Sequence, residues 1–516
     1  MERFSEKVFL QLQMPSEEHP QSDQLQIRQA LHACGYTHIS IPLHVLQKLY
    51  PMCRDCGFAI TVTLVYRETE WIVTDVEPGD QRRHHYGIAV DYGSTTIVME
   101  LVDMNSGVVI DRVKEVNGQV EYGTDILSRI TYTLEDPAHM QILQQVTVRT
   151  FESALQQLTE HTGIDAGKCP VMIVSGNTTM IHFLLQLNAW TVFAAPFAPV
   201  VTDPGWMWGK ELGMDFAGML YMMPSASNYI GGDIVSGLLK LDIHKKKETS
   251  LFFDIGTNGE LIIGNKDWMV AGAGAAGPAL EGYISRYGMR AADGAIDTVK
   301  IRGSKLTYTT IGNQKPVGIC GSGIIDLLAQ MRLNGWVNAA GDLNPDASDS
   351  IVWQAEAQEY AAVYATAEES AAGHSLFFSQ TDIRQYLDTK AAAYTMIESL
   401  LETVGCKEEE LERFYLSGAF AAHSDLESVI TIGMLPDLPR EIFTGLANTS
   451  LDGARILLLN RSRLEEVRKL SEEMVCLQFA SVPDFLVRMQ AAKFIPHTDS
   501  RRYPTVMARL AARENR

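Results

Sequence analysis

Two stretches of this sequence share one pattern: an apolar run that ends in an aspartate, a glycine-containing polar turn, and a second apolar run. The first is GIAVDYGSTTIVM at positions 87–99, and the second is LFFDIGTNGE at positions 251–260 with the apolar residues that follow it. Short apolar runs of this kind are typical of buried β-strands. Because Asp91 and Asp254 occupy the same register relative to the glycines, the two hairpins predict a duplicated architecture.

The turn residues have the chemistry of a site for nucleotide phosphate. Glycine lets backbone N–H groups approach phosphate oxygens, and serine or threonine hydroxyl groups add donors. An aspartate at a strand end can hold hydrated Mg²⁺, which prefers water and one or two carboxylates. We expect the two hairpins to clamp a triphosphate from both sides, with Asp91 and Asp254 as metal ligands and catalytic residues. Two ordinary glycine-rich hairpins are the alternative. The loop residues expected to contact the phosphates are Gly93, Ser94, Thr95, Thr96, Gly256, Thr257 and Asn258.

The composition excludes several classes of protein. A chain of 516 residues is too long for one core, and 46% hydrophobic with 21% charged residues is typical of a soluble globular protein. The net charge of −20 argues against a nucleic-acid partner. No stretch approaches the roughly 18 uninterrupted apolar residues of a membrane span, and the polar start is unlike a signal peptide. We therefore expect a cytoplasmic protein that does not bind a membrane.

The seven cysteines are scattered and odd in number, as expected for reduced thiols. Cys53 and Cys56 alone have the spacing of metal ligands, and no second pair nearby completes a four-ligand site. A metal or redox role for this pair is the less favoured interpretation.

Turn signals and the two hairpins suggest three regions. Residues 1–83 are predicted to form a small α/β domain, because a helical apolar pattern precedes two β-rich runs. A turn at 77–80 then leads into a polar stretch that includes His84 and His85. We interpret this stretch as a solvated linker, with a pair of histidine ligands as the less favoured alternative. The two hairpins divide the rest into residues 84–245 and 246–516.

Several further glycine-containing polar stretches follow strands or begin helices, where ligands often bind. The run 272–277 is a literal GxGxxG, but no following strand ends in an acid at the distance that a dinucleotide site needs. A helix N-terminus that lines the nucleotide cleft is the preferred interpretation, with NAD or FAD binding as the alternative. Residues 448–450 are expected to cap a helix. The additional candidate binding residues are Gly176, Asn177, Thr178, Gly231, Gly232, Gly277, Gly321, Ser322, Gly323, Gly418, Ala419 and Phe420.

Taken together, these segments resemble the ATP-dependent reductive activators of corrinoid proteins, which belong to the superfamily of actin, sugar kinases and heat-shock chaperones. The resemblance extends from about residue 60 to the end, over four-fifths of the chain. The segments that carry it are GIAVDYGSTT (87–96), EYGTDILSRI (121–130), SGNTTMIH (175–182), FDIGTNGE (253–260), AAGPALEGYISRYGMRAADGAI (275–296), GICGSGIID (318–326), IGMLP (432–436) and LANTSLDGA (446–454).

The resemblance implies an α/β fold with a duplicated actin-like (ribonuclease H-like) ATPase core behind the small N-terminal α/β domain. It implies ATP and Mg²⁺ as cofactors and a corrinoid protein of a methyltransferase system as the partner, in which Co(II) is reduced to Co(I). By similarity, residues 231–233 form the hinge connection, Asp233 is a third candidate catalytic acid, and residues 417–420 form the adenosine loop. A homodimer is left open.

The sequence departs from these activators at two places. They commonly carry an iron–sulfur domain with closely spaced cysteines, and neither the region before residue 80 nor the C-terminal stretch offers such a set. We therefore expect no iron–sulfur cluster, and electrons from a separate low-potential donor. The adenosine loop has the sequence Ser-Gly-Ala-Phe where the relatives carry a Gly-Gly-Phe-Gly run, so nucleotide affinity is expected to differ.

Two alternatives of other classes share the same fold. A small-molecule kinase would transfer phosphate to a metabolite. A non-reducing chaperone or corrinoid-delivery ATPase would bind the corrinoid protein without changing the redox state of cobalt.

Overall fold

The computed structural model describes residues 2–256, 259–274, 284–418 and 423–514. The chain divides into two compact units. Unit 1 contains residues 1–241 and 449–473, and unit 2 contains residues 242–448 and 474–516. A segment from the C-terminal part of the sequence therefore belongs to the same unit as the N-terminus.

Unit 1 begins with a small sheet whose strands follow the order β1-β3-β4-β2. Ile60 and Val62 alternate along β3 and join Ile27 and Leu31 of the first helix in one buried cluster, so the sheet and its helices share a core. The elements are β1 (Ser5–Gln11), α1 (Asp23–Ala33), β2 (Ile39–Ser40), α2 (Leu43–Asp55), β3 (Ala59–Arg67) and β4 (Glu70–Pro78).

The interpretation of the polar stretch after β4 as a solvated linker is wrong for His85. Its side chain is buried, and Nε2 lies 2.9 Å from the hydroxyl oxygen of Ser5 at the start of β1. The imidazole is therefore shielded from solvent, although the next strand, β5, begins only at Tyr86.

The second sheet of unit 1 has the strand order β7-β6-β5-β8-β10-β9 in the described residues. β5 pairs antiparallel with β6 and parallel with β8, and β8 pairs parallel with β10. The strands are β5 (Tyr86–Tyr92), β6 (Thr96–Asp103), β7 (Val109–Val116), β8 (Val171–Gly176), β9 (Gly205–Trp208) and β10 (Met219–Met222).

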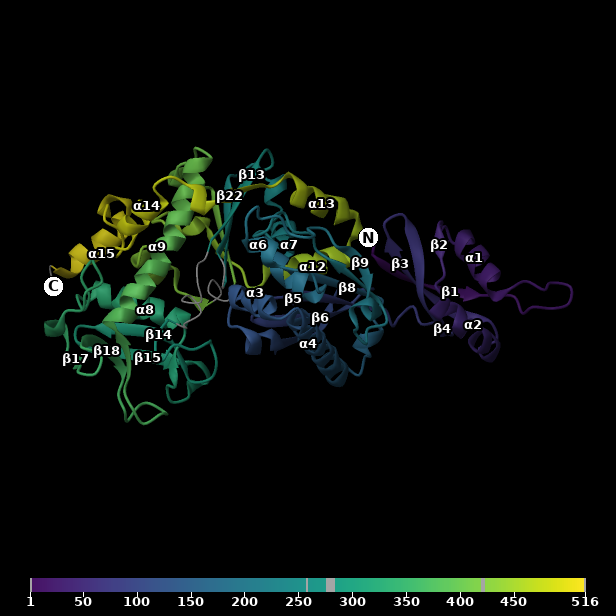
Figure 1. Cartoon of the computed structure of the whole chain (residues 1–516), viewed down its shortest axis with the longest axis horizontal. Coiled ribbons are helices and arrows are strands. Elements are labelled where there is room, and N and C mark those ends of the chain that lie inside the picture. Colours follow the sequence, from purple (N-terminus) through teal and green to yellow (C-terminus); the bar gives the residue numbers. More distant parts are fainter. Residues whose placement is uncertain (1, 257–258, 275–283, 419–422, 515–516) are drawn as a thin grey trace. The chain divides into compact units, whose positions relative to one another are not determined.

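Helices cover both faces of this sheet (Figure 1), and the alternation along β5 decides what each face contacts. Ile88, Val90 and Tyr92 belong to the buried cluster that includes α4. Gly87 and Asp91 point to the other face, where α12 packs on β5. The helices of unit 1 are α3 (Ile126–Glu135), α4 (Ala138–Thr162), α5 (Thr178–Leu184), α6 (Trp190–Phe193), α7 (Gly232–Leu241), α12 (Thr449–Leu459) and α13 (Leu464–Glu473).

The main sheet of unit 2 has the strand order β21-β20-β11-β12-β13-β22 in the described residues. β11 pairs antiparallel with β12 and parallel with β20, and β20 pairs parallel with β21. These pairings repeat those of β5, β6, β8 and β10, so the predicted duplication and the actin-like α/β fold class are confirmed. The strands are β11 (Ser250–Ile255), β12 (Gly259–Gly264), β13 (Met269–Gly274), β20 (Arg413–Ser417), β21 (Phe443–Gly445) and β22 (Val475–Gln478).

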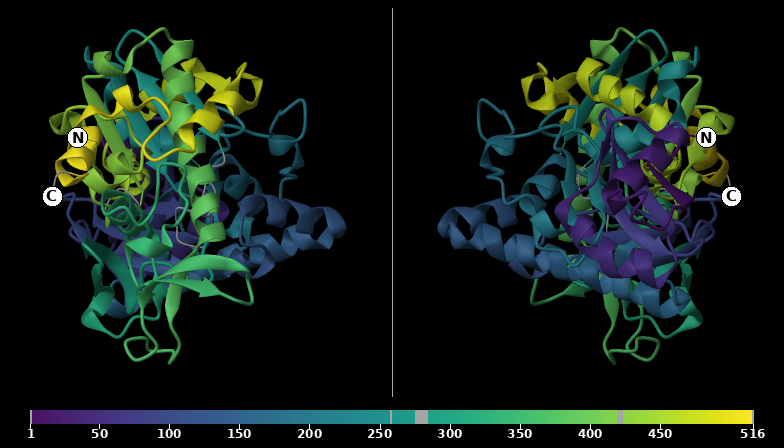
Figure 2. Two further views of the ribbon diagram at one scale, coloured as in Figure 1. Left: turned by 90° about the vertical axis from the view of Figure 1, so that its left-hand side faces the viewer. Right: turned by 90° about the vertical axis from the view of Figure 1, so that its right-hand side faces the viewer.

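Two smaller three-stranded sheets elaborate unit 2 between β13 and its longest helix, α9, which packs against β12 and β13. Figure 2 shows α9 in green beside the yellow helix α14, with which it packs. The added strands are β14 (Ala295–Arg302), β15 (Lys305–Thr310), β16 (Gly318–Ile319), β17 (Ile351–Gln354), β18 (Glu359–Ala365) and β19 (Leu376–Ser379). The helices are α8 (Gly321–Leu333), α9 (Gln380–Thr403), α11 (Leu426–Thr431), α14 (Phe485–Ala492) and α15 (Pro504–Glu514).

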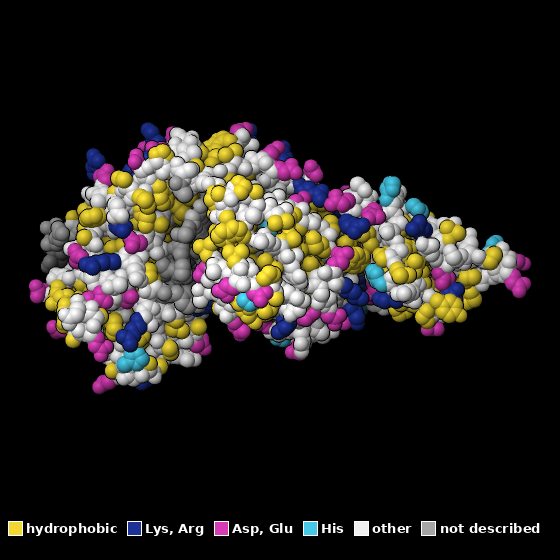
Figure 3. Space-filling model, in the orientation of Figure 1, with side chains coloured by type: hydrophobic (Ala, Val, Ile, Leu, Met, Phe, Trp, Pro, Cys, Tyr) yellow, Lys and Arg dark blue, Asp and Glu magenta, His cyan; other side chains and the backbone are white. Residues whose placement is uncertain are grey.

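The character of the helices and the distribution of surface charge both bear on the class of protein. Throughout the described part of the chain, every helix lacks the length or the apolar character needed to cross a membrane. On the face drawn in Figure 3, lysine and arginine side chains are scattered among acidic ones, in keeping with the net charge of −20.

Candidate functional site

The first predicted phosphate loop is a tight turn between β5 and β6. The N–H of Gly93 donates to the carbonyl oxygen of Thr96 at 3.1 Å. A Cβ atom at Gly93 would lie 2.5 Å from that oxygen, so only glycine fits. Asn117 braces the turn by donating its side-chain amide to the Gly93 carbonyl at 2.9 Å and its backbone N–H to the Thr95 carbonyl at 3.0 Å. The backbone of the loop is thus held from within unit 1, with Ser94 partly exposed at its tip.

Asp91, at the end of β5, is partly buried and contacts a buried serine. Ser450 on α12 donates its hydroxyl proton to Oδ1 of Asp91 at 2.8 Å. The hydroxyl oxygen of Ser175 lies 2.9 Å from that of Ser450 and 2.8 Å from that of Ser236 on α7. The three serines are nearly excluded from water, with exposed fractions of 6%, 0% and 0% for Ser450, Ser175 and Ser236. Asp91 therefore stands at one end of a chain of buried hydroxyl groups.

A second carboxyl group lies close enough to Asp91 to interact with it electrostatically. Asp233 is in the first turn of α7, and its Oδ1 accepts the N–H of Ile234 at 2.9 Å. Burial raises the pKa of Asp233, and the negative charge of Asp91 raises that pKa further, against the lowering effect of the backbone hydrogen bond. The two carboxyl groups therefore interact, and the charge of Asp91 makes ionisation of Asp233 less favourable.

Close backbone packing explains the glycines beside Asp233. A Cβ atom at Gly231 would lie 2.4 Å from Cα of Asn177, and one at Gly232 would lie 2.5 Å from the Met223 carbonyl oxygen. These glycines let the start of α7 approach the ends of β8 and β10.

The side chains of Asn177 and Thr178 are used in hydrogen bonds within unit 1. Asn177 caps α5 by accepting the N–H of Met180 at 2.9 Å, and the Thr178 hydroxyl donates to the Ser227 carbonyl at 2.9 Å. These bonds hold the loop in place next to Gly176, and its role in ligand binding stays a prediction.

Unit 2 repeats the relationship between Asp91 and Ser175. In the parallel pair of β11 and β20, Asp254 lies opposite Ser417, as Asp91 lies opposite Ser175 in the pair of β5 and β8. A glycine follows each serine. A Cβ atom at Gly418 would lie 2.3 Å from the Ile255 carbonyl oxygen, and one at Gly176 would lie 2.9 Å from the Tyr92 carbonyl oxygen. Since each of these carbonyls belongs to the residue after the aspartate, the duplication extends to the packing of single atoms.

The glycines at the start of α8 also serve close packing. A Cβ atom at Gly323 would lie 2.3 Å from the Ile296 carbonyl oxygen of β14, and Gly321 and Ser322 are buried. The predicted site residues Thr257, Asn258, Gly277, Ala419 and Phe420 lie outside the described residues.

One residue of the expected helix cap at 448–450 contacts the predicted site residue Asp91. α12 begins at Thr449, so Ser450 lies inside the helix and its side chain reaches Asp91. Ser175 and Ser236 were not among the predicted site residues. A signal was present for Ser175, because Ser-Gly follows the strand in both SGN (175–177) and SGA (417–419).

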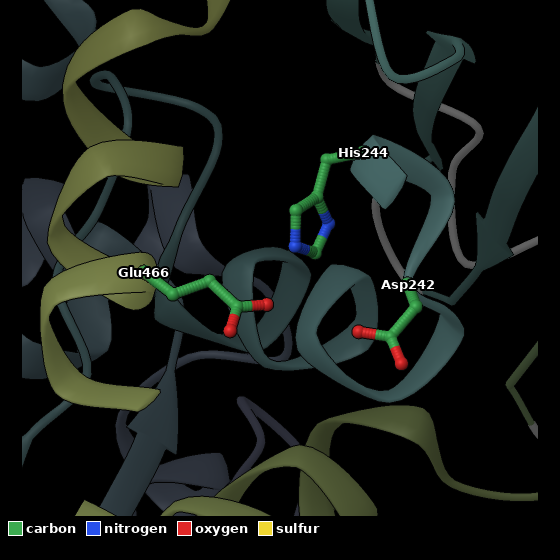
Figure 4. Close-up of side chains that lie close together, drawn as sticks. All are labelled: Asp242, His244 and Glu466. Carbon is green, nitrogen blue, oxygen red and sulfur yellow. The ribbon is translucent and has the colours of Figure 1, made fainter. Parts of the chain in front are cut away.

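A group of three possible metal ligands and a surface hollow include neither Asp91 nor Asp254. Figure 4 shows Asp242 and His244 after α7 and Glu466 on α13. The first two belong to unit 2, whereas Glu466 belongs to unit 1 and pairs there with Arg463. A hollow of about 810 Å³ in unit 1 is lined by residues of α4, by residues 184–186 and by residues 210–213, and contains none of the predicted site residues.

Two sheets of one topology, each with an aspartate at the end of its central strand, define the actin-like class of protein. Comparison with family models gives the same class. Residues 248–507 match the C-terminal domain of RACo, described as the ASKHA domain, residues 86–246 match the RACo middle region, and residues 1–83 match the RACo linker region. The chain belongs to the RACo family.

Individual relatives agree with this assignment. The chain is 31% identical over 424 residues to the corrinoid activation enzyme RamQ of Eubacterium limosum, covering 80% of this chain and 71% of that protein. It is 24% identical over 417 residues to the [Co(II) methylated amine-specific corrinoid protein] reductase of Methanosarcina barkeri, covering 75% and 73% respectively. A solved reductive activator for corrinoid,iron-sulfur protein superimposes with a TM-score of 0.89 and 32% identity, covering 98% of this chain and 81% of that one.

Proposed function

We propose that this protein is an ATP-hydrolysing activator that promotes the reduction of Co(II) to Co(I) in a corrinoid protein of a methyltransferase system. The observation that carries the proposal is the match to a reductive activator over 98% of the chain, at a TM-score of 0.89 and 32% identity. The names of the two sequence relatives support the same substrate class.

The proposed ATPase chemistry rests on the two aspartate hairpins. Asp91 and Asp254 are strand-end carboxylates, the ligand type that Mg²⁺ prefers, and Gly93 permits the tight turn of the first phosphate loop. Mg²⁺ bound to ATP would neutralise phosphate charge during hydrolysis. Asp233, whose pKa is raised by burial, is suited to accept and return a proton near the attacking water.

The proposed reaction has two coupled parts. Water hydrolyses ATP to ADP and phosphate, while one electron from a separate low-potential donor reduces Co(II) to Co(I). ATP binding or hydrolysis must then favour a protein state that changes the environment of the cobalt, since a ligand shifts an equilibrium only by its differential affinity.

An external donor is proposed because Cys53, one of the two cysteines with the spacing of metal ligands, is poorly suited to hold a cluster. Cys53 is buried on α2, and burial raises the pKa of its thiol to about 11, with the charge of Asp23 as a smaller cause. A thiol that resists deprotonation is a poor metal ligand.

The test is to titrate the protein into candidate corrinoid proteins held as Co(II), with titanium(III) citrate as reductant, while cobalt absorbance and phosphate release are recorded. Co(I) should accumulate only when this protein, ATP and reductant are all present, and the corrinoid protein should stimulate ATP hydrolysis or tighten nucleotide binding.

Equal reduction without this protein would overturn the proposal. Binding that leaves the cobalt spectrum unreduced would instead favour the chaperone or delivery function. Transfer of the γ-phosphate to a metabolite would favour a kinase.

A further inference from the structure

The position of Ser450 in unit 1 is fixed by three independent contacts of α12. A Cβ atom at Gly453 would lie 2.0 Å from the Ser236 carbonyl oxygen, so the backbones of α12 and α7 meet at this glycine. Arg455 pairs with Glu100 of β6 at 2.7 Å, and the Glu100 carboxylate is fully buried. Asp452 pairs with Lys240 of α7 at 3.1 Å. These contacts leave the first turn of α12 little freedom to move relative to β5.

The hydroxyl group of Ser450 has one proton, and an ionised carboxylate can only accept. The Ser450 oxygen lies 2.8 Å from Oδ1 of Asp91 and is 6% exposed, so water competes weakly for this bond. A hydrogen bond to a charged group is stronger than one between neutral groups, so this bond favours one orientation of the carboxylate.

Ser175 and Ser236 extend the arrangement away from Asp91. Both side chains are fully buried, and their hydroxyl oxygens lie 2.8 Å apart. The hydroxyl oxygen of Ser175 also lies 3.1 Å from the carbonyl oxygen of Gly232 at the start of α7. The hydrogen-bonded groups that begin at Asp91 therefore connect the strands β5 and β8 with the helices α7 and α12.

We propose that Ser450 is a positioning residue, which holds the Asp91 carboxylate in the orientation needed for hydrolysis of Mg–ATP. The inference rests on the ATPase function proposed above and names a residue that acts through Asp91. The chain enters unit 1 from unit 2 between residues 448 and 449, at the start of α12. The contacts described above that hold α12 lie within unit 1.

The test compares Ser450→Ala with Ser450→Thr, which keeps the hydroxyl group. Ser450→Ala should lower kcat for ATP hydrolysis by about tenfold to a hundredfold, with the KM for ATP changed by less than about threefold. Ser450→Thr should restore kcat to within about threefold of wild type. Ser153→Ala is the matched control, because it removes an exposed α4 hydroxyl that bonds to Glu115.

A second readout does not depend on turnover. The rise in Tm on adding Mg–ADP, relative to ADP with EDTA, should be smaller in Ser450→Ala than in wild type or Ser153→Ala. Urea unfolding curves of each variant without ligand separate this effect from a loss of fold.

The outcomes distinguish the two proposals. If wild type hydrolyses no ATP and is not stabilised by Mg–ADP, the proposed function fails. If wild type does both and folded Ser450→Ala matches it in kcat and in the Tm rise, the positioning role alone is overturned. Failure of a folded Ser450→Thr to recover activity also contradicts that role.

Discussion

Asp91 lies directly opposite Ser175 in the parallel pairing of β5 and β8. Unit 2 repeats this relationship in Asp254 and Ser417, on β11 and β20. In each unit a carboxylate and a hydroxyl group therefore meet at the carboxyl ends of two central parallel strands, where ligands bind in open α/β sheets. A repeated register of this kind favours one shared chemical role for the two aspartates.

The first prediction concerns these aspartates. Asp91→Ala and Asp254→Ala should each lower ATP hydrolysis by about a hundredfold or more, because phosphoryl transfer depends on positioned metal and electrostatic stabilisation. Phosphate release at saturating Mg–ATP measures the effect. The controls are Asp55→Ala and Asp349→Ala, which change exposed aspartates of unit 1 and unit 2. Wild-type rates in both test variants would show that the hairpins are not the catalytic loops.

The second prediction concerns the crossing of α7 and α12. Gly453→Ala should lower the free energy of unfolding by about 1–3 kcal/mol, because the new methyl group meets the Ser236 carbonyl oxygen, a backbone atom that cannot rotate away. Gly167→Ala is the control, since its Cβ atom would have its nearest neighbours at 3.4 Å. Urea denaturation gives the free energy of unfolding of both variants. Equal values would mean that α7 and α12 can move apart to accept the methyl group without loss of stability, which would contradict the prediction.

The third prediction is a dependence of stability on pH that comes from His85. The pKa of His85 is lowered to about 3, mainly by burial and to a smaller extent by the positive charges of Lys7 and Arg3, while Asp103 acts in the opposite direction. The unfolded chain has a histidine pKa near 6.5. Above that pH both states are neutral. As the pH falls from about 6.5 toward 3, only the unfolded state takes up the proton, so stability is lost.

Between pH 7 and pH 5.5 this group alone should lower the free energy of unfolding by about 1.3 kcal/mol. His85→Gln should show a correspondingly smaller decrease over the same interval, whereas His19→Gln, at an exposed site, should behave like wild type. A wild-type pH slope in His85→Gln would refute the assignment.

The fourth prediction is that the purified protein contains no iron–sulfur cluster. Cys53 is buried with a raised pKa, and its thiol would have to lose a proton in an apolar surrounding to bind iron. Iron and acid-labile sulfide should therefore stay far below one equivalent per chain after anaerobic purification. Stoichiometric iron and sulfide, lost in Cys53→Ser but kept in the exposed control Cys34→Ser, would contradict this expectation and identify a ligand.

The sequence by itself determined the class of fold and the two aspartate loops. Strand apolarity, a terminal aspartate and a glycine turn are local properties, and their repetition in 87–99 and 251–260 was sufficient to predict a duplicated α/β core. Gly93 could be assigned to a turn for the same reason, since its conformation depends on its immediate neighbours. These features follow from short-range sterics and from the period of a β-strand.

The tertiary structure alone decided what holds Asp91. Ser450 is far from Asp91 in the sequence and has the local appearance of a helix cap, yet its hydroxyl group donates to Asp91 at 2.8 Å. His85 likewise has the polar neighbours of a linker and is buried against Ser5. Both outcomes depend on where separate segments pack, because a hydrogen bond between distant residues leaves no periodic signal in the chain.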